Sequence, residues 1–175
     1  MVTQQDNAAT GFGEFPSQAL PRLVFVVPQE LPLAEVAERL LRRWRRDWHQ
    51  RPPAWILVEE GRHANLVEML RRRLAKTSPL PSPPNVDGLF RDATLAALDG
   101  GATLVTGGQD LSDAGLQATL FVNVKPSLRL LHNPEVQGPI LCLSRSSGPE
   151  RNRFLLEQME SPVRLHRFQT QRTES

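Results

Sequence analysis

The chain has 175 residues, of which 39% are hydrophobic and 23% charged, enough for one domain that buries roughly two-thirds of its unfolded surface. Its 21 Lys and Arg only slightly exceed its 19 Asp and Glu, which argues against a protein built for nucleic-acid binding. The single cysteine excludes an internal disulfide bond, and no stretch approaches the ~20 apolar residues of a membrane span. We therefore expect a cytoplasmic protein without a membrane, nucleic-acid or metal partner.

The polarity of the two ends sets the expected domain limits. Residues 1–19 are polar and contain glycine, so they are expected to form a flexible N-terminal arm. Residues 170–175 are expected to form a polar tail. Between them, residues 20–169 are expected to form a single α/β domain, and no internal repeat divides this region.

The first half of the expected domain alternates between strand and helix patterns. Residues 23–27 are a continuous apolar run closed by Pro28, which is typical of a strand buried on both faces. Residues 31–48 place apolar side chains every three or four positions, which predicts a helix with an arginine-rich outer face. A strand at 54–58 and a helix at 62–76 repeat this order. The arginine-rich face suits a solvated surface, and a phosphate or membrane-surface patch is the alternative.

The second half is punctuated by proline and glycine. Residues 77–84 form a proline-rich loop, and a helix at 86–99 is expected to end in a left-handed cap at Gly100. Three short apolar runs then predict buried strands, and Gly-Gly pairs beside them mark turns or close backbone approaches. The runs are residues 103–105, 120–124 and 139–143, and the pairs are residues 100–101 and 107–108.

A helix at 149–159 and an edge strand at 163–168 complete the series. The alternation of strands and helices predicts an α/β fold with a largely parallel sheet and flanking helices. The edge strand would be open to pairing with a strand of another chain. In the competing, monomeric interpretation, Arg164, His166 and Arg167 protect that edge.

The residue types that commonly carry chemistry give few signals. No glycine-rich turn opens a helix and no phosphate-binding lysine loop occurs, so neither common nucleotide cradle is encoded. Cys142 lies within an apolar run, which favours a buried, inert thiol over a nucleophile. Glu59 and Glu60 are adjacent, so their side chains would point apart rather than share a proton. The histidines lack metal-ligand spacing and are expected on the surface or in loops; they are His49, His63, His132 and His166.

Several segments together resemble one known family. Gly-Ala-Thr-Leu-Val-Thr-Gly-Gly at 101–108, Ala-Thr-Leu-Phe-Val-Asn-Val at 118–124 and Glu-Val-Gln-Gly-Pro-Ile-Leu at 135–141 are similar to the second half of the aldehyde dehydrogenase catalytic domain. Residues 53–60 resemble the segment that follows the family's nucleophile, and residues 161–165 resemble a strand of its shorter fatty-aldehyde branch. The resemblance covers roughly residues 20 to 170 in the family's order.

The resemblance implies a catalytic-domain fold. It also shows which residues of the family's catalytic machinery are missing from this chain. The family's nucleophilic cysteine belongs just before residues 53–60, where this chain has Trp-His-Gln-Arg-Pro at 48–52, without a thiol, hydroxyl or lysine. Gln-Ala-Leu-Pro at 18–21 stands where the family has its general-base glutamate. The family's dinucleotide-binding domain is expected to be missing as well. Glu135 matches the glutamate that meets the nicotinamide ribose, and we expect it to be vestigial, with no cofactor bound.

Two functional hypotheses follow from this resemblance. In the first, the protein is a non-catalytic interaction or structural partner that binds itself or another protein chain. In the second, it is a component of an NAD(P)-dependent aldehyde oxidoreductase whose cofactor domain and nucleophile come from another chain. Neither version lets residues 48–52 of this chain supply the nucleophile.

Overall fold

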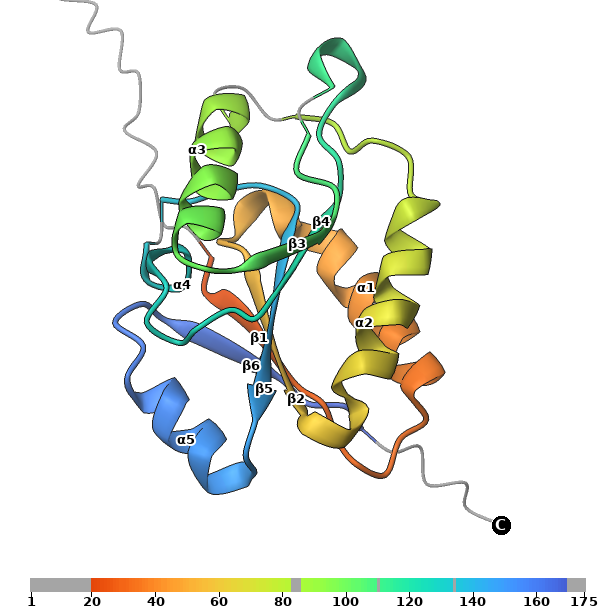
Figure 1. The fold of residues 1–175 in the computed structure, drawn as a ribbon, viewed down its shortest axis with the longest axis vertical. Helices are drawn as coiled ribbons and strands as arrows, with labels where there is room; N and C mark the ends of the chain where they lie inside the picture. Colours follow the sequence, from red (N-terminus) through yellow and green to blue (C-terminus); the bar gives the residue numbers. More distant parts are fainter. Residues whose placement is uncertain (1–19, 83–85, 110, 134, 170–175) are drawn as a thin grey trace, which may run out of the picture.

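A computed structural model describes residues 20–82, 86–109, 111–133 and 135–169, which form one layered α/β structure (Figure 1). The expected arm and tail, and the end of the proline-rich loop, lie outside the described residues. A six-stranded sheet runs through the centre in the order β3-β4-β5-β2-β1-β6. The strands are β1 Arg22–Val26, β2 Ala54–Glu59, β3 Thr103–Thr106, β4 Thr119–Val122, β5 Ile140–Ser146 and β6 Val163–His166.

All neighbouring strands are parallel except β3 and β4, which are antiparallel. The pairing of β2 with β5 is the longest, and it runs from Ala54 opposite Leu141 to Glu59 opposite Ser146. Continuous apolar runs such as β2 suit this position, because a central parallel strand is covered on both faces. The largely parallel α/β fold expected from the sequence is confirmed.

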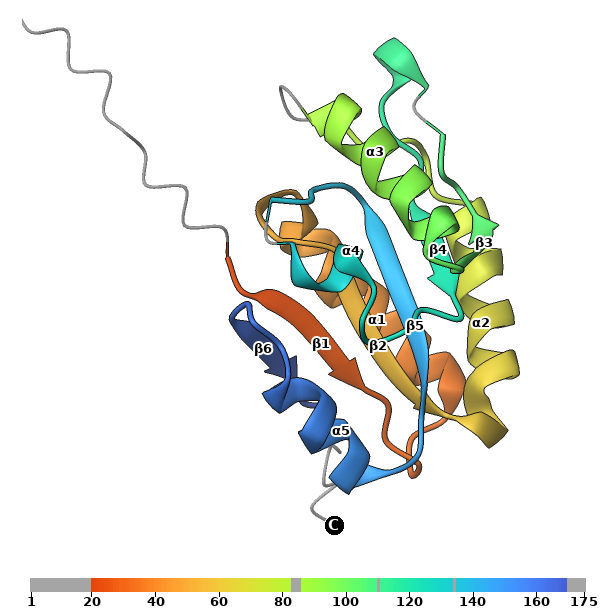
Figure 2. The same ribbon diagram turned by 60° about the vertical axis from the view of Figure 1, so that its left-hand side comes forward.

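Helices α1 (Leu33–Asp47) and α2 (Glu60–Ala75) cover one face of the sheet (Figure 2). Each helix follows a strand and returns across the sheet, and its buried side chains fall at spacings of three and four. The expected inner face of α1 is confirmed, since Trp44 and the following Trp48 are almost completely buried. These helices and the sheet share one core cluster that includes Leu23, Phe25, Leu40, Ile56, Leu70 and Leu143.

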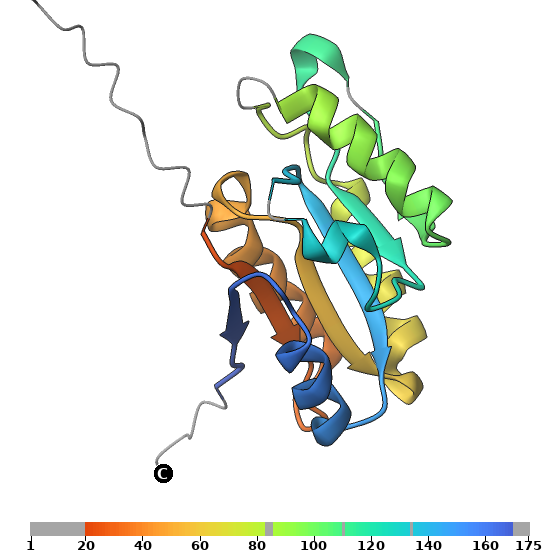
Figure 3. The ribbon, with the colours of Figure 1, turned by 90° about the vertical axis from the view of Figure 1, so that its left-hand side faces the viewer.

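Helices α3 (Val86–Asp99), α4 (Arg129–His132) and α5 (Pro149–Glu157) cover the other face (Figure 3). Trp55 is fully buried there, and its indole N–H donates a 2.8 Å hydrogen bond to Ser144 Oγ. Sequence periodicity did not predict α4 because one turn is too short to give a repeating pattern. None of the helices in the described residues combines the length and apolar character needed to span a membrane.

Two expectations for this half of the chain were wrong in detail. The run at 103–105 is β3, but it is exposed or half-buried rather than buried, because it lies at the end of the sheet and pairs only with β4 in the described residues. The left-handed residue that ends α3 is Gly101, with φ +89°, rather than Gly100. Gly100 still continues the helical bonding to Ala96, and Ala102 N–H then bonds back to Ala97.

A substitution at Gly107 tests the backbone conformation of the turn after β3. Its φ is +84°, and an added Cβ would lie 2.3 Å from the carbonyl oxygen of Ala118. We expect Gly107→Ala to lower the free energy of unfolding by about 2–3 kcal/mol, measured by urea denaturation. Gly61→Ala is the control, because Gly61 lies in α2 with open space around it and should gain about 0.5–1 kcal/mol. Equal midpoints for the two variants would contradict the assigned turn.

Candidate functional site

The loops that precede the parallel strands meet at one edge of the sheet, here called the amino edge. Residues 48–53 enter β2 there, and Leu20 N–H bonds to Gln50 O at 3.1 Å. The backbone of Arg22 bonds to Pro162 O at the start of β6, and Ser161 Oγ donates to His132 O at 3.2 Å. The amino edge therefore gathers the segments that the sequence singled out around residues 20, 50 and 135.

Arg51 closes the loop before β2. Its side chain is 4% exposed and forms a 2.9 Å ion pair with Asp47, one helical turn earlier, while Nη1 donates to Pro21 O. Asp47 also accepts from Arg43 at 2.9 Å. Burial raises the pKa of Asp47, but the hydrogen bonds from Arg43 and Arg51 outweigh burial and hold that pKa below its usual value. A buried guanidinium thus fills the centre of the 48–52 segment.

A second arginine lies deeper at the same edge. Arg22 is fully buried, and its Nη1 donates to Pro53 O. Nε and Nη2 have no hydrogen-bond partner among the described residues. Burial lowers the pKa of Arg22 to about 10, while the nearby Cys142 sulfur acts in the opposite direction. No sequence pattern indicated that this cation is buried, because Arg22 begins a strand whose remaining residues are apolar.

Cys142 is buried on the face of the sheet that α3, α4 and α5 cover, as expected. Burial raises the pKa of its thiol to about 12, against a smaller lowering effect of Arg22. At neutral pH the thiol is therefore protonated, and a protonated thiol is a poor nucleophile.

The histidines do not assemble a metal site. No group of three or more His, Cys, Asp or Glu in the described residues is placed to hold a metal ion. His63 corrects one expectation, because it is 6% exposed in the first turn of α2 rather than at the surface or in a loop. Burial, and then Arg145, lowers its pKa, so the neutral imidazole is favoured.

Glu135 lies at the amino edge and is exposed, and its backbone N–H donates to Asn133 Oδ1 at 2.9 Å. It lines a groove of about 310 Å³ between α3 and α4, together with Leu89, Ala96 and Val136. A larger cavity of about 790 Å³ lies at the opposite, carboxyl edge of the sheet, between α5 and β6. Sequence reasoning missed that cavity because its walls come from four separate segments of the chain, residues 26–30, 57–59, 146–157 and 165–167.

No protein-family model matches the sequence, and no curated protein sequence matches it. Solved structures do match the fold. An aldehyde dehydrogenase from Bartonella henselae superposes with TM-score 0.67 at 22% identity, over 80% of this chain and 32% of that one. An NADP-dependent glyceraldehyde-3-phosphate dehydrogenase from Bacillus halodurans gives 0.67 at 19% identity, over 79% and 31%. An oxidoreductase from Marinobacter aquaeolei gives 0.69 at 20% identity, over 80% and 32%.

The chain has the fold of part of an aldehyde dehydrogenase. The resemblance drawn from the sequence is thereby confirmed at the level of the fold. The chain spans about a third of the length of the structures that it matches. In this aldehyde dehydrogenase fold, the segment expected to carry a nucleophile is the Arg51 loop, and Glu135 lies at the same edge of the sheet.

The groove at Glu135 does not fit a nicotinamide dinucleotide. Its volume of about 310 Å³ is at the lower end for small-molecule pockets. Asp92 and Glu135 bring two carboxylates to the groove, and Arg129 is the single cation that lines it. An anionic pyrophosphate is therefore poorly matched to these described residues. That Glu135 is a vestigial match to the family's ribose-binding glutamate stays a prediction.

The burial of Cys142 predicts slow thiol chemistry. Labelling of the native protein with a thiol reagent should be slower by orders of magnitude than labelling in denaturant, because the sulfur is enclosed and protonated. The reaction can be followed by mass spectrometry over time. Cys142→Ser, which has no thiol, gives the background signal. Similar rates in native and denaturing conditions would contradict both the strand assignment and the inert thiol.

Proposed function

We propose that this protein is a non-catalytic domain of aldehyde dehydrogenase fold that acts by binding another protein chain. The single observation that carries the non-catalytic part is Arg51. It fills the segment where the resembling family has its nucleophile, and its guanidinium is committed to Asp47 and to the backbone of Pro21. An arginine in this state is a charged donor and offers no nucleophilic lone pair.

The other groups near the 48–52 segment do not replace a thiolate. His49 is exposed, and its Nε2 lies 3.1 Å from Gln50 Nε2, with no carboxylate within the described residues to orient it. Cys142 belongs to a central strand and has a pKa of about 12. Covalent aldehyde chemistry requires an accessible, activated nucleophile, and neither side chain meets both conditions.

Helix α3 carries the apolar surface that supports a binding role. Leu89, Leu95 and Leu98 are 43%, 55% and 41% exposed, although they belong to one helix of a small protein. Residues of a helix follow one another at about 100°, so Leu95 and Leu98 lie about 60° apart on one side of α3, and Leu89 lies on the opposite flank beside the groove that Ala96 and Val136 also line. The Leu95 and Leu98 pair is the apolar surface that we propose another protein covers.

The β6 edge is a second candidate surface. In the described residues β6 pairs only with β1, so its outer edge is unpaired, as the sequence predicted. Arg164 and Arg167 are exposed beside it. A second copy of β6 would bring like charges together, which disfavours direct pairing of two such edges. The α3 leucines are therefore the surface that we propose for the partner.

The first prediction from this proposal concerns catalysis. The purified chain, supplied with NAD or NADP and a panel of aliphatic and aromatic aldehydes, should produce no reduced cofactor above background. Absorbance of the reduced nicotinamide measures this directly. Turnover that disappears on Cys142→Ala would overturn the proposal. Turnover that appears only when a second chain is added would favour the oxidoreductase-component hypothesis instead.

The second prediction concerns association. Light scattering after size exclusion should show a species larger than the monomer, whose proportion increases with protein concentration. If the partner is another protein, a complex should instead be recovered from native extract. Leu95→Glu with Leu98→Glu should weaken that association by about 2 kcal/mol or more, because both charges would be placed in an apolar contact. Both side chains are exposed, so the fold should persist.

Arg164→Glu is the matched control for this experiment, since it changes charge at the β6 edge and leaves α3 intact. If Arg164→Glu abolishes association and the leucine variant does not, the partner binds the β6 edge. A monomer at all concentrations, with no partner recovered from native extract, would contradict the proposed binding role.

A further inference from the structure

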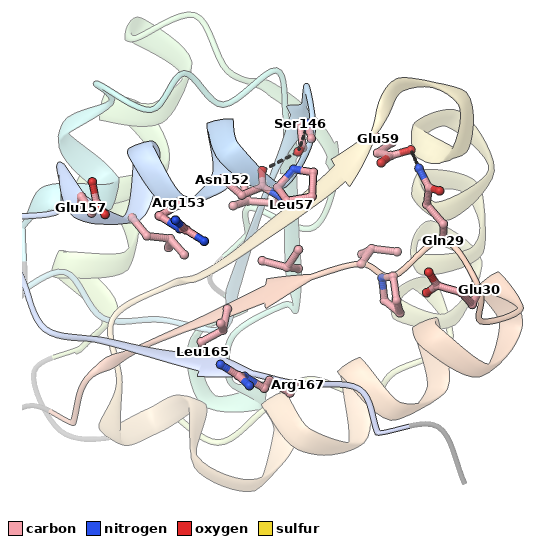
Figure 4. Close-up of a pocket in the computed structure, with 16 residues that line it drawn as sticks. Gln29, Glu30, Leu57, Glu59, Ser146, Asn152, Arg153, Glu157, Leu165 and Arg167 are labelled. Atoms are coloured by element: carbon pink, nitrogen blue, oxygen red, sulfur yellow. Dashed lines mark hydrogen bonds between the residues drawn. The ribbon is translucent and has the colours of Figure 1, made fainter. Parts of the chain in front are cut away.

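A cavity lined by Val26, Arg153 and Leu165 lies away from the amino edge and has no part in the proposed function. Its volume of about 790 Å³ falls within the range of small-molecule sites. It opens between α5 and β6, above the carboxyl ends of β1 and β2 (Figure 4). The course of the chain explains why the cavity opens at that edge.

The chain leaves two neighbouring strands in opposite directions at this point. From the end of β2 it enters α2 on one face of the sheet, and from the end of β5 it enters α5 on the other. Such a reversal opens a crevice at the carboxyl ends of parallel strands, which is where open α/β sheets bind ligands. Glu59 ends β2, Ser146 ends β5, and both line the cavity.

Two unpaired cationic groups line the cavity. Arg153 of α5 and Arg167 after β6 both line it, and neither forms an ion pair or hydrogen bond within the described chain. Figure 4 shows Arg153 on the α5 wall and Arg167 on the β6 wall, with Leu165 between them. A guanidinium presents a planar pair of donors that matches the two oxygens of a carboxylate.

Asn152 adds a donor to the α5 wall. Its side chain is 8% exposed, and its Oδ1 accepts a hydrogen bond from Ser146 Oγ. That bond fixes the carboxamide and leaves Nδ2 without a partner among the described residues. The first turn of α5 begins beside it at Gly148, with no side chain capping its N–H groups. An amide donor on a largely buried residue and an uncapped helix start both favour an anionic group at this point.

The floor of the cavity is apolar. Val26, Leu57, Leu156 and Leu165 line it, and Leu165 is 39% exposed, which is unusual for a leucine in a strand. A ligand with a hydrocarbon body would cover these side chains and remove them from water. An anionic head and an apolar body are therefore both accommodated in one cavity.

The far side of the cavity limits the number of negative charges in the ligand. Glu30 and Glu59 lie there, and Gln29 Nε2 donates to Glu59 (Figure 4). Glu157 lies one helical turn beyond Arg153 and further reduces the positive potential. These carboxylates would repel a second anionic group, so a dicarboxylate or a polyphosphate fits less well than a single carboxylate.

We propose that this cavity binds a small amphiphilic monocarboxylate. The carboxylate lies on the α5 wall beside Arg153 and Asn152, Arg167 adds positive charge from the β6 wall, and the hydrocarbon body lies on Val26, Leu156 and Leu165. The site is at the opposite edge of the sheet from Arg51 and is independent of the partner surface on α3.

Calorimetric titration of the full chain with octanoate tests this site, with suberate and octylamine as matched probes. Octanoate should bind saturably at one site per chain. Suberate places a second carboxylate toward Glu30 and Glu59, and octylamine lacks the anionic head, so each should bind at least about tenfold more weakly. Equal affinity for octanoate and octylamine, or no saturable binding of octanoate, would overturn the proposal.

Variants locate the site on the molecule. Arg153→Ala and Arg167→Ala should each weaken octanoate binding by about tenfold or more. Arg151→Ala and Arg164→Ala are the controls, because Arg151 belongs to α5 as Arg153 does, Arg164 lies in β6 three residues before Arg167, and neither control arginine lines the cavity. They should bind octanoate as the unchanged protein does. An equal loss in all four variants would indicate binding to general positive charge and would contradict the site.

A second measurement keeps the test independent of folding defects in the variants. Amide chemical shifts of Gly148 and Asn152 in the unchanged protein should move as octanoate is added, because both residues line the cavity. Shifts confined to α3 or to the amino edge would place the ligand elsewhere and overturn the proposal. The titrations and the chemical shifts are all measured on the chain without a partner. A result that contradicts the octanoate site therefore does not bear on the proposed partner binding.

Discussion

The pairing of β2 with β5 determines where every candidate surface of this protein lies. Its six residue pairs run from Ala54 opposite Leu141 to Glu59 opposite Ser146, in parallel register. Parallel register forces both preceding loops to one edge and both following helices to start at the other. The Arg51 loop and the Glu135 loop therefore share the amino edge. The starts of α2 and α5 share the carboxyl edge, where the chain reverses direction and the large cavity opens.

At the amino edge the described side chains form structural contacts where the resembling family would need an activated thiol. A nucleophilic thiol needs partial exposure and a positive neighbour that stabilises the thiolate. Here the cations are present, but Arg51 is bound to Asp47 and Arg22 is enclosed beside a thiol that burial keeps protonated. Removing one member of such a buried ion pair leaves the other charge unsatisfied, so the loop is held by structural rather than catalytic interactions.

The two edges also differ in what they offer to other molecules. Near the amino edge, α3 presents leucines that are about half exposed, a surface suited to a large apolar partner. At the carboxyl edge, the apolar side chains are recessed and bordered by unpaired arginines, which suits a small ligand with one charged group. The surface proposed for a protein partner and the cavity proposed for a small ligand are therefore separate parts of the molecule.

The sequence by itself determined the six strands, the longer helices, the α/β class, the burial of Cys142 and the absence of a thiol before β2. These follow from local patterns, because apolar spacing of two, three or four residues reports which side of an element faces the core. Only the tertiary structure decided that Arg22 and His63 are buried, that β3 is half exposed, and that Arg153 and Arg167 border one cavity. Those facts depend on strand order, which brings distant segments together and has no signature in the spacing of residues along the chain.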